Sequence, residues 1–168
     1  PDRLRFDISH QKPLDPDEIA AVEEMVNARV VVNEHVDTHL MSPEEAIESG
    51  AMALFGEKYG DEVRVVSMGG LANEGQPNGP AYSVELCGGT HVRRTGDIGL
   101  FKIVNESAVS AGVRRIEALT GADARVFLES REQLLANTAE ALKSAPEAVP
   151  ARVLQLLDER RKMERELT

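Results

Sequence analysis

The stretch E85-L-C-G-G-T-H-V92 follows a predicted strand and places a cysteine and a histidine, Cys87 and His91, four residues apart. A thiolate and an imidazole are good ligands for zinc, which takes four ligands, or three plus an open position in a catalytic site. Gly88 and Gly89 let the backbone approach a ligand closely, or leave amides free for an oxyanion. Without context, a buried cysteine near a structural histidine is the commoner explanation of such a pair, so the flanking sequence decides.

The segment upstream of this stretch predicts a strand followed by a helix. Residues 4–8 alternate apolar and polar side chains, which predicts a half-buried strand. Asp15-Pro16 predicts a helix start, because Asp caps a helix and Pro fits its first position. That helix is expected to end before residues 30–32, a β-branched run that favours a strand.

The middle of the chain predicts a second helix and further strands. Ser42 and Glu45 have the spacing of a capping box, which marks a helix start. Turn-forming residues fill most of 69–80 and predict a loop. Strands are expected over residues 63–66, 81–86, 100–104 and 113–119, the last two as an antiparallel pair.

Helical spacing dominates the end of the chain. Residues 122–143 and 151–168 each carry apolar side chains at helical spacing, and prolines break the chain between them, which predicts a helical hairpin. We therefore expect a boundary near Gly121, with one domain over 1–121 and the hairpin over 122–168. The apolar stripe of the last helix spans only about two heptads, so it is expected to pack on the preceding helix or on another chain.

The net charge of −10 argues against a general nucleic-acid binder, which is typically basic. Any RNA contact is therefore expected from a local patch of basic residues, since arginine can bind two phosphate oxygens at once. Two of them, Arg114 and Arg115, are neighbours in a predicted strand and point to opposite faces, so at most one is expected to line a cleft. Ordinary surface residues paired with carboxylates are the alternative. The candidates are Arg93, Arg94, Lys102, Arg114 and Arg115.

The cysteine count and the hydropathy pattern indicate a cytoplasmic protein without membrane contact. Cys87 is the only cysteine, so an internal disulfide is impossible, which suits a reducing cytosol. No apolar run approaches the roughly 18 residues of a membrane span. Residues 1–10 lack a signal-peptide pattern and an initiator Met and are typical of a strand interior, which suggests a fragment of a longer protein.

Two polar pairs leave alternatives open. His35 and His39 would share one face of a strand, but roughly 13 Å apart at ~3.3 Å per residue, too far for one metal ion without a bend. We therefore expect two solvent-facing histidines at a strand edge. Arg5 and Asp7 also share a strand face, and they form either a surface ion pair or the polar floor of a cleft.

Several blocks of the chain, in order and with similar gaps, resemble bacterial alanyl-tRNA synthetase. They cover most of residues 3–121, and the helical tail resembles the linker that leads to the C-terminal domain of that family. The blocks are R3-L-R-F-D-I-S-H10, residues 44–66, S83-V-E-L-C-G-G-T-H-V92, T95-G-D-I-G-L-F-K-I103 and A111-G-V-R-R-I-E-A-L-T-G121.

The resemblance implies a two-layer α+β editing domain, an antiparallel or mixed sheet with helices on one side, that hydrolyses the ester of Ser- or Gly-tRNA(Ala). It also implies a zinc ion held by Cys87 and His91 together with an H-x-x-x-H pair that lies upstream of Arg3 in the family. His35 and His39 come after that block, so they do not match the pair. With two of four ligands, the fragment alone is expected to be inactive or poorly active. The aminoacylation domain, with its ATP and magnesium, is missing.

The resemblance also implies roles and partners. Amides around Gly88, Gly89 and Thr90 are candidates to stabilise an oxyanion, and the zinc either activates water or orients the substrate. The expected partners are tRNA(Ala), the rest of the synthetase chain, and a second copy through the hairpin or exposed strand edges. The alternatives are a free-standing trans-editing deacylase and a tRNA-binding or oligomerisation module without chemistry. Candidate contacts to tRNA are Arg5, Asp7, Arg93, Arg114 and Arg115.

Overall fold

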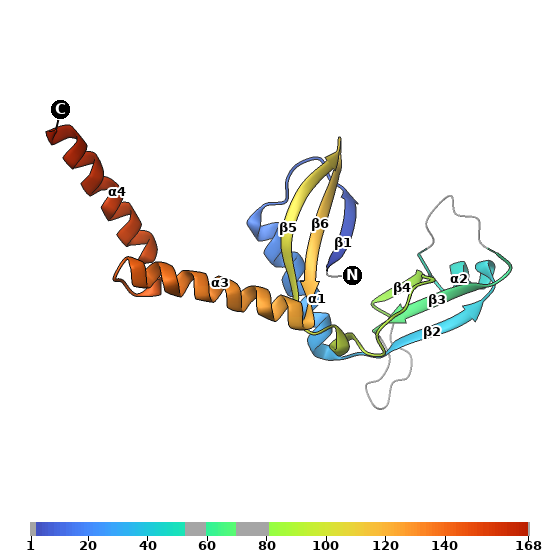
Figure 1. The fold of residues 1–168 in the computed structure, drawn as a ribbon. Coiled ribbons are helices and arrows are strands. Elements are labelled where there is room, and N and C mark those ends of the chain that lie inside the picture. The colour runs from blue at the N-terminus through green and yellow to red at the C-terminus, as the bar shows by residue number, and fades with distance from the viewer. Residues whose placement is uncertain (1–2, 53–59, 70–80, 168) are drawn as a thin grey trace. The chain divides into compact units, whose positions relative to one another are not determined.

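The computed structural model describes residues 3–52, 60–69 and 81–167. The loop expected over 69–80 lies almost entirely outside these residues. The chain divides into two compact units, Pro1–Ala124 and Arg125–Thr168 (Figure 1).

The first unit contains two three-stranded antiparallel sheets, each with a helix packed on one face, so the expected α+β class is confirmed. The strand orders are β1-β6-β5 and β2-β3-β4. The first sheet consists of β1 (Leu4–Ser9), β6 (Val113–Thr120) and β5 (Phe101–Ser110), and α1 (Pro16–Val32) packs on it. The second consists of β2 (Val36–Met41), β3 (Val63–Met68) and β4 (Ser83–Leu86), and α2 (Pro43–Glu48) packs on it.

The core of the first sheet is formed by Phe101, Ile103, Ile116 and Ala118, against which Ile19 and Val26 of α1 pack. The amide of Asn27 adds a polar link between helix and sheet. Its Nδ2 donates to the carbonyl of Phe101 (2.9 Å), and its Oδ1 accepts from the N–H of the same residue (2.9 Å). The helix is thereby held to the first residue of β5.

Helix α1 begins as expected, with a reciprocal capping box between Asp15 and Glu18. The expectation that it ends before residues 30–32 is wrong, because the helix continues to Val32. Val30 is buried and its packing outweighs the strand preference of the β-branched run. The helix ends at Asn33, which adopts the left-handed conformation at φ 57 and donates its N–H to the carbonyl of Val30.

The strand β1 is present as expected, but its apolar face is only partly buried. Ile8 packs against the core, whereas Leu4 and Phe6 remain 48% and 60% exposed. The expectation of a half-buried strand is therefore wrong for these two residues. The physical reason is that the core under α1 is built on β5 and β6, and only Ile8 of β1 reaches it.

In the second sheet, Ala46 of α2 packs against Val63 and Val65 of β3. The expected capping box between Ser42 and Glu45 is confirmed at the start of this helix. Since side chains alternate along a strand, Arg64 lies on the face opposite α2. This second face carries the candidate site.

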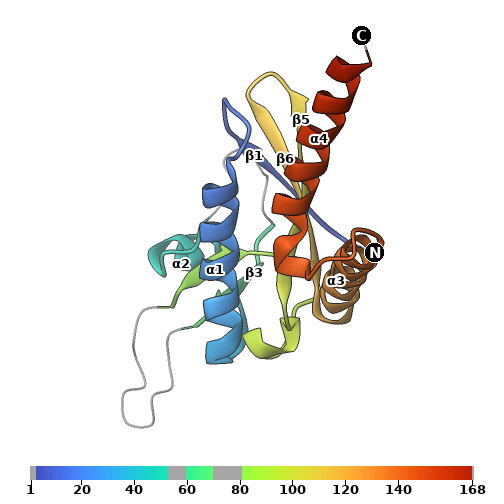
Figure 2. The ribbon, with the colours of Figure 1, turned by 90° about the vertical axis from the view of Figure 1, so that its left-hand side faces the viewer.

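The second unit is helical, and most of its apolar side chains are exposed. Helix α3 (Gly121–Ala141) leads into this unit, a 3-10 turn η2 (Pro146–Ala148) follows, and α4 (Val149–Glu166) ends the chain (Figure 2). Leu134 and Met163 are each 57% exposed. Packing of this stripe on another chain therefore stays a prediction. Among the described residues, no helix is long and apolar enough to cross a membrane.

Candidate functional site

Residues 87–94, which we call the site loop, leave β4 and cross the face of the second sheet that α2 leaves open. At the start of the loop, the N–H of Cys87 donates to the carbonyl of Arg64 in β3 (3.1 Å). At its end, the N–H of Val36 donates to the carbonyl of Arg93 (3.0 Å), which ties the loop to the beginning of β2. The site loop is therefore fixed to the sheet at both ends by backbone hydrogen bonds.

Arg64 lies under this loop and was not recognised from the sequence. Its Nε donates to the carbonyl of Cys87 (2.9 Å). Its Nη2 is buried and has no hydrogen-bond partner among the described residues. Buried polar atoms are nearly always paired, so this N–H is an unused donor. The only available sequence signal was one charged residue inside the valine run V63-R-V-V66.

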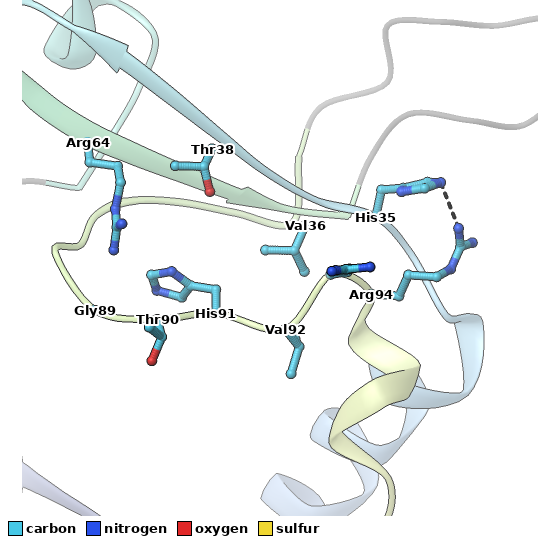
Figure 3. A pocket seen from close by; sticks show the side chains of 10 residues that line it. His35, Val36, Thr38, Arg64, Gly89, Thr90, His91, Val92 and Arg94 are labelled. Atoms are coloured by element: carbon cyan, nitrogen blue, oxygen red, sulfur yellow. Dashed lines mark hydrogen bonds between the residues drawn. The ribbon is translucent and has the colours of Figure 1, made fainter.

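A pocket of about 600 Å³ lies between the sheet and the site loop. Figure 3 shows the Arg64 guanidinium and the Thr38 hydroxyl directed from the sheet toward the loop, with the His91 ring between Arg64 and the loop. The Thr90 side chain points to the other side of the loop in the same view. The lining residues are His35, Val36, Thr38, Arg64, Gly89, Thr90, His91, Val92, Arg93 and Arg94.

His35 and Arg94 form a second polar contact at the end of the pocket. The Nη1 of Arg94 lies 2.6 Å from the Nε2 of His35 (Figure 3). A guanidinium has donors only, so the histidine nitrogen accepts. The Nε and Nη2 of Arg94 both donate to the carbonyl of Asn33 (3.1 and 2.7 Å). Arg94 is thus fixed in place, because donors on all three of its nitrogens are occupied.

Two residues after the loop hold its end in position. The N–H groups of Arg93 and Arg94 both donate to the Asp97 carboxylate (3.2 and 3.1 Å). Thr95, the buried polar residue of this region, donates its hydroxyl to the carbonyl of Arg29 (2.8 Å) and accepts from the N–H of Glu34 (2.9 Å). These contacts connect the end of the loop to the last turn of α1, at Arg29, and to Glu34, which follows the helix.

Cys87 and His91 are two donors suitable for zinc. Cys87 is a free, half-buried thiol and His91 lines the pocket. Among the described residues, no group of three or more His, Cys, Asp or Glu side chains gathers where a metal ion could bind. The donor chemistry fits zinc, but two donors are fewer than the three or four protein ligands that zinc sites use.

His39 lies in the edge strand β2 and is exposed, and His35 precedes that strand and is also exposed. The expected position of two solvent-facing histidines at a strand edge is therefore confirmed. The expectation did not foresee that His35 contacts Arg94 and lines the pocket.

The remaining candidates lie on the other sheet, outside the lining of this pocket, and form ion pairs. Arg114 contacts Glu106, with both side chains largely buried, whereas Arg115 contacts Asp7 (2.7 Å) near the surface. Glu106 is in register with Ile116, so Arg114 and its partner share the face of Ile116, whereas Arg115 and Asp7, in register with each other, lie on the other face, as expected. The other pairs are Arg5 with Glu117 (3.0 Å) and Lys102 with Glu23 (2.7 Å).

Three of these pairs, those made by Arg115, Arg114 and Arg5, favour the charged form of the carboxylate. Hydrogen bonding from Arg115 holds the pKa of Asp7 below its ordinary value. Arg114 does the same for the pKa of Glu106, and Arg5 for the pKa of Glu117. The arginines on this sheet are thus partly neutralised, whereas the guanidinium of Arg64 contacts a neutral backbone carbonyl.

Comparison with known proteins defines the class first. Residues 63–117, which include β3, β4 and the site loop, match the family model of the threonyl and alanyl tRNA synthetase second additional domain. The chain thus carries a domain of aminoacyl-tRNA synthetases.

Sequence identity to individual relatives identifies the particular family. The chain is 61% identical over 166 residues to alanine–tRNA ligase of Rhizorhabdus wittichii, and the aligned region covers 99% of this chain and 18% of the relative. It is 58% identical over 167 residues to the enzyme of Parvibaculum lavamentivorans (99% and 18%) and 62% identical over 169 residues to that of Sinorhizobium medicae (100% and 19%). The chain belongs to the alanine–tRNA ligase family as a fragment that spans about a fifth of these relatives, which confirms the resemblance stated from the sequence.

Proposed function

We propose that this chain forms part of an editing site that hydrolyses mischarged Ser- or Gly-tRNA(Ala) within an alanine–tRNA ligase. The observation that carries the proposal is the pocket, in which His91 lies with Arg64, Arg93 and Arg94 beside the start of the site loop. A pocket for the acylated end of a tRNA needs polar groups for the ester and cations for the phosphates. Both kinds of group line this pocket.

Zinc is the proposed cofactor, with Cys87 and His91 as two of its ligands. When bound, the ion would polarise the ester carbonyl or lower the pKa of a water molecule. Arg64 orients Cys87 through the hydrogen bond to its carbonyl (2.9 Å). The backbone amides of Gly88, Gly89 and Thr90, which are exposed residues, are the proposed donors to the oxyanion that forms during hydrolysis.

The fragment alone is expected to bind zinc weakly and to have little or no hydrolytic activity. Two protein ligands leave a zinc site open, so metal binding is expected to be weak and hydrolysis slow or absent. The other ligands are expected from an upstream H-x-x-x-H pair, as the resemblance implies. ATP and magnesium belong to the aminoacylation domain and are not needed for ester hydrolysis. The partners are tRNA(Ala) and the remainder of the synthetase.

The test compares hydrolysis of Ser-tRNA(Ala) by a chain extended upstream through the H-x-x-x-H pair and by its Cys87→Ala variant. We expect the variant to lose hydrolysis while its affinity for tRNA(Ala) stays unchanged. A Glu62→Gln variant, which changes an exposed carboxylate outside the pocket, serves as the matched control. Unchanged hydrolysis in Cys87→Ala would reject the role of this residue, and tRNA binding without hydrolysis in the wild-type chain would favour a binding module. A rate for the present fragment that equals the rate of the full-length enzyme would contradict the incomplete site.

A further inference from the structure

Arg64 carries a donor that no described residue uses. The residue lies in β3 between the buried Val63 and Val65, so its side chain leaves the sheet in a fixed direction. Its Nε bond to the carbonyl of Cys87 orients the guanidinium further. Its Nη2 group is buried and without a partner among the described residues, and the guanidinium that carries it is directed toward the site loop (Figure 3). A buried N–H without an acceptor is costly, which indicates that a bound group supplies one.

The charges around the pocket favour an anion. Its lining contains three arginines and two histidines, and no Asp or Glu. The nearby carboxylate of Asp97 is occupied by the backbone N–H groups of Arg93 and Arg94. The chain as a whole carries a net charge of −10, so this pocket is a cationic site on an acidic molecule. Its volume of about 600 Å³ suits a ligand as large as a nucleotide.

The three arginines differ in what they can offer. Arg94 has donors on all three nitrogens committed to Asn33 and His35, so it contributes charge and a rigid wall. Arg93 is exposed and can move toward a ligand. Arg64 has an unpaired donor that its bond to the Cys87 carbonyl already orients, and a ligand reaches this donor when the overlying His91 ring moves aside. A tetrahedral phosphate, with several oxygens for donors from different directions, matches this arrangement.

We propose that the pocket between β2, β3 and the site loop is a phosphate-binding subsite, in which the Nη2 of Arg64 donates to a phosphate oxygen and Arg93 supplies a second cation. If the proposed function holds, on which this part of the inference rests, the phosphate is a phosphodiester near the 3′ end of the bound tRNA. The subsite would then position the terminal nucleotide beside Cys87 and His91.

The first experiment titrates the ¹⁵N-labelled 168-residue chain with inorganic phosphate at constant ionic strength, with chloride as the replaced anion. We expect saturable shifts of the Arg64 Nε–H signal and of the amides of residues 89–94. Arg64→Lys is expected to weaken phosphate binding by about tenfold or more, because an ammonium group cannot hold the Cys87 carbonyl and the phosphate in the same geometry. The Arg131→Lys variant, in α3, makes the same exchange elsewhere and should bind as the wild type does.

If Arg64→Lys disturbs the fold, the amide signals of the β3 core will shift, and a second variant then tests the proposal. Arg93→Gln changes an exposed side chain and is expected to weaken phosphate binding severalfold while the spectrum of the sheet stays the same. Absence of saturable shifts in the wild-type chain would overturn the proposal. Binding of equal strength in a folded Arg64→Lys variant would overturn it as well.

The second experiment identifies the source of the phosphate. The RNA trinucleotide CCA is expected to shift the same signals and to compete with inorganic phosphate. Adenosine, which has no phosphate, is expected neither to shift these signals nor to compete. Equal shifts with adenosine would show base recognition and overturn the phosphate assignment. Phosphate binding without CCA binding would overturn the RNA assignment. If the upstream-extended chain fails to hydrolyse Ser-tRNA(Ala) while CCA still binds through Arg64, the proposed function fails and the phosphate subsite stands.

Discussion

Arg64 and Cys87 are joined by two hydrogen bonds in opposite directions. The N–H of Cys87 donates to the carbonyl of Arg64 (3.1 Å), and the Nε of Arg64 donates to the carbonyl of Cys87 (2.9 Å). The residue that starts the site loop is therefore held by both the backbone and the side chain of one residue in β3. A loop that must present a thiol in a fixed direction gains precision from such an attachment to a rigid strand.

This double attachment predicts that loss of the Arg64 side chain exposes the thiol. Arg64→Leu removes the charged donor, whose hydrogen bond contributes about 1.5–3 kcal/mol, so the start of the loop should open more often. We expect alkylation of Cys87 by iodoacetamide to become about tenfold faster or more, as followed by mass spectrometry. Cys87 is the only cysteine, so the signal has one source.

The matched control for this prediction is Arg93→Leu, which changes an exposed arginine of the same loop. Its alkylation rate should stay within about twofold of the wild-type rate, because its side chain makes no bond to Cys87. An unchanged rate in a folded Arg64→Leu protein would show that the backbone alone holds the loop.

Asn27 predicts a large effect on stability, because one amide side chain satisfies both backbone groups of Phe101. Asn27→Leu leaves a buried N–H and a buried carbonyl without partners, each at a cost of about 1–3 kcal/mol. We expect the free energy of unfolding to fall by about 2–4 kcal/mol in urea denaturation. Glu24→Gln, on the exposed side of α1, should leave it almost unchanged, and a similar loss in both variants would refute the role of the amide.

The parts of the fold that the sequence predicts well depend on neighbouring residues. Both capping boxes, at Asp15 and at Ser42, need only contacts three residues apart, and both are present. The end of α1 was missed because the burial of Val30 is a tertiary property that strand propensity does not contain. The exposure of Phe6 was missed for a similar reason, since alternation reveals a shared face but not how much of that face is covered by other elements.

The same distinction explains which site residues the sequence revealed. Cys87 and His91 are close in the chain and have recognisable chemistry. Arg64 and Thr95 act through partners that lie 23 and 61–66 residues away. His35 was judged from its spacing to His39, whereas its contact is with Arg94, 59 residues away. Long-range pairs of this kind require the sheet register, which one sequence does not provide.

The Glu106–Arg114 pair predicts a specific loss of stability in acid. The hydrogen bond from Arg114 holds the pKa of Glu106 below its ordinary value in the folded chain. The pair therefore stabilises the fold above the ordinary glutamate pKa, and this contribution is lost as the pH falls through the lowered pKa. Glu106→Gln should lower the melting temperature near neutral pH, and its difference from the wild type should shrink as the pH falls through that range.

The control for the acid prediction is Glu62→Gln, an exposed carboxylate before β3. Its melting temperature should follow the wild-type curve at every pH when both are recorded by circular dichroism. A difference between Glu106→Gln and wild type that stays constant from neutral to acidic pH would show that the carboxylate titrates without coupling to folding.

Thr95 predicts a change that affects both stability and the pocket. Its hydroxyl donates to the carbonyl of Arg29 and accepts from the N–H of Glu34, so it joins the last turn of α1 to the end of the site loop. Thr95→Val keeps the shape but removes both bonds, at an expected cost of about 1–3 kcal/mol in the free energy of unfolding. Thr95→Ser keeps the hydroxyl and removes one methyl group, for about 1 kcal/mol. Because Arg94 precedes Thr95, its Nε–H signal should also shift and broaden in Thr95→Val and not in Thr95→Ser. Equal destabilisation in the two variants would assign the role of this residue to its methyl group and not to its hydroxyl.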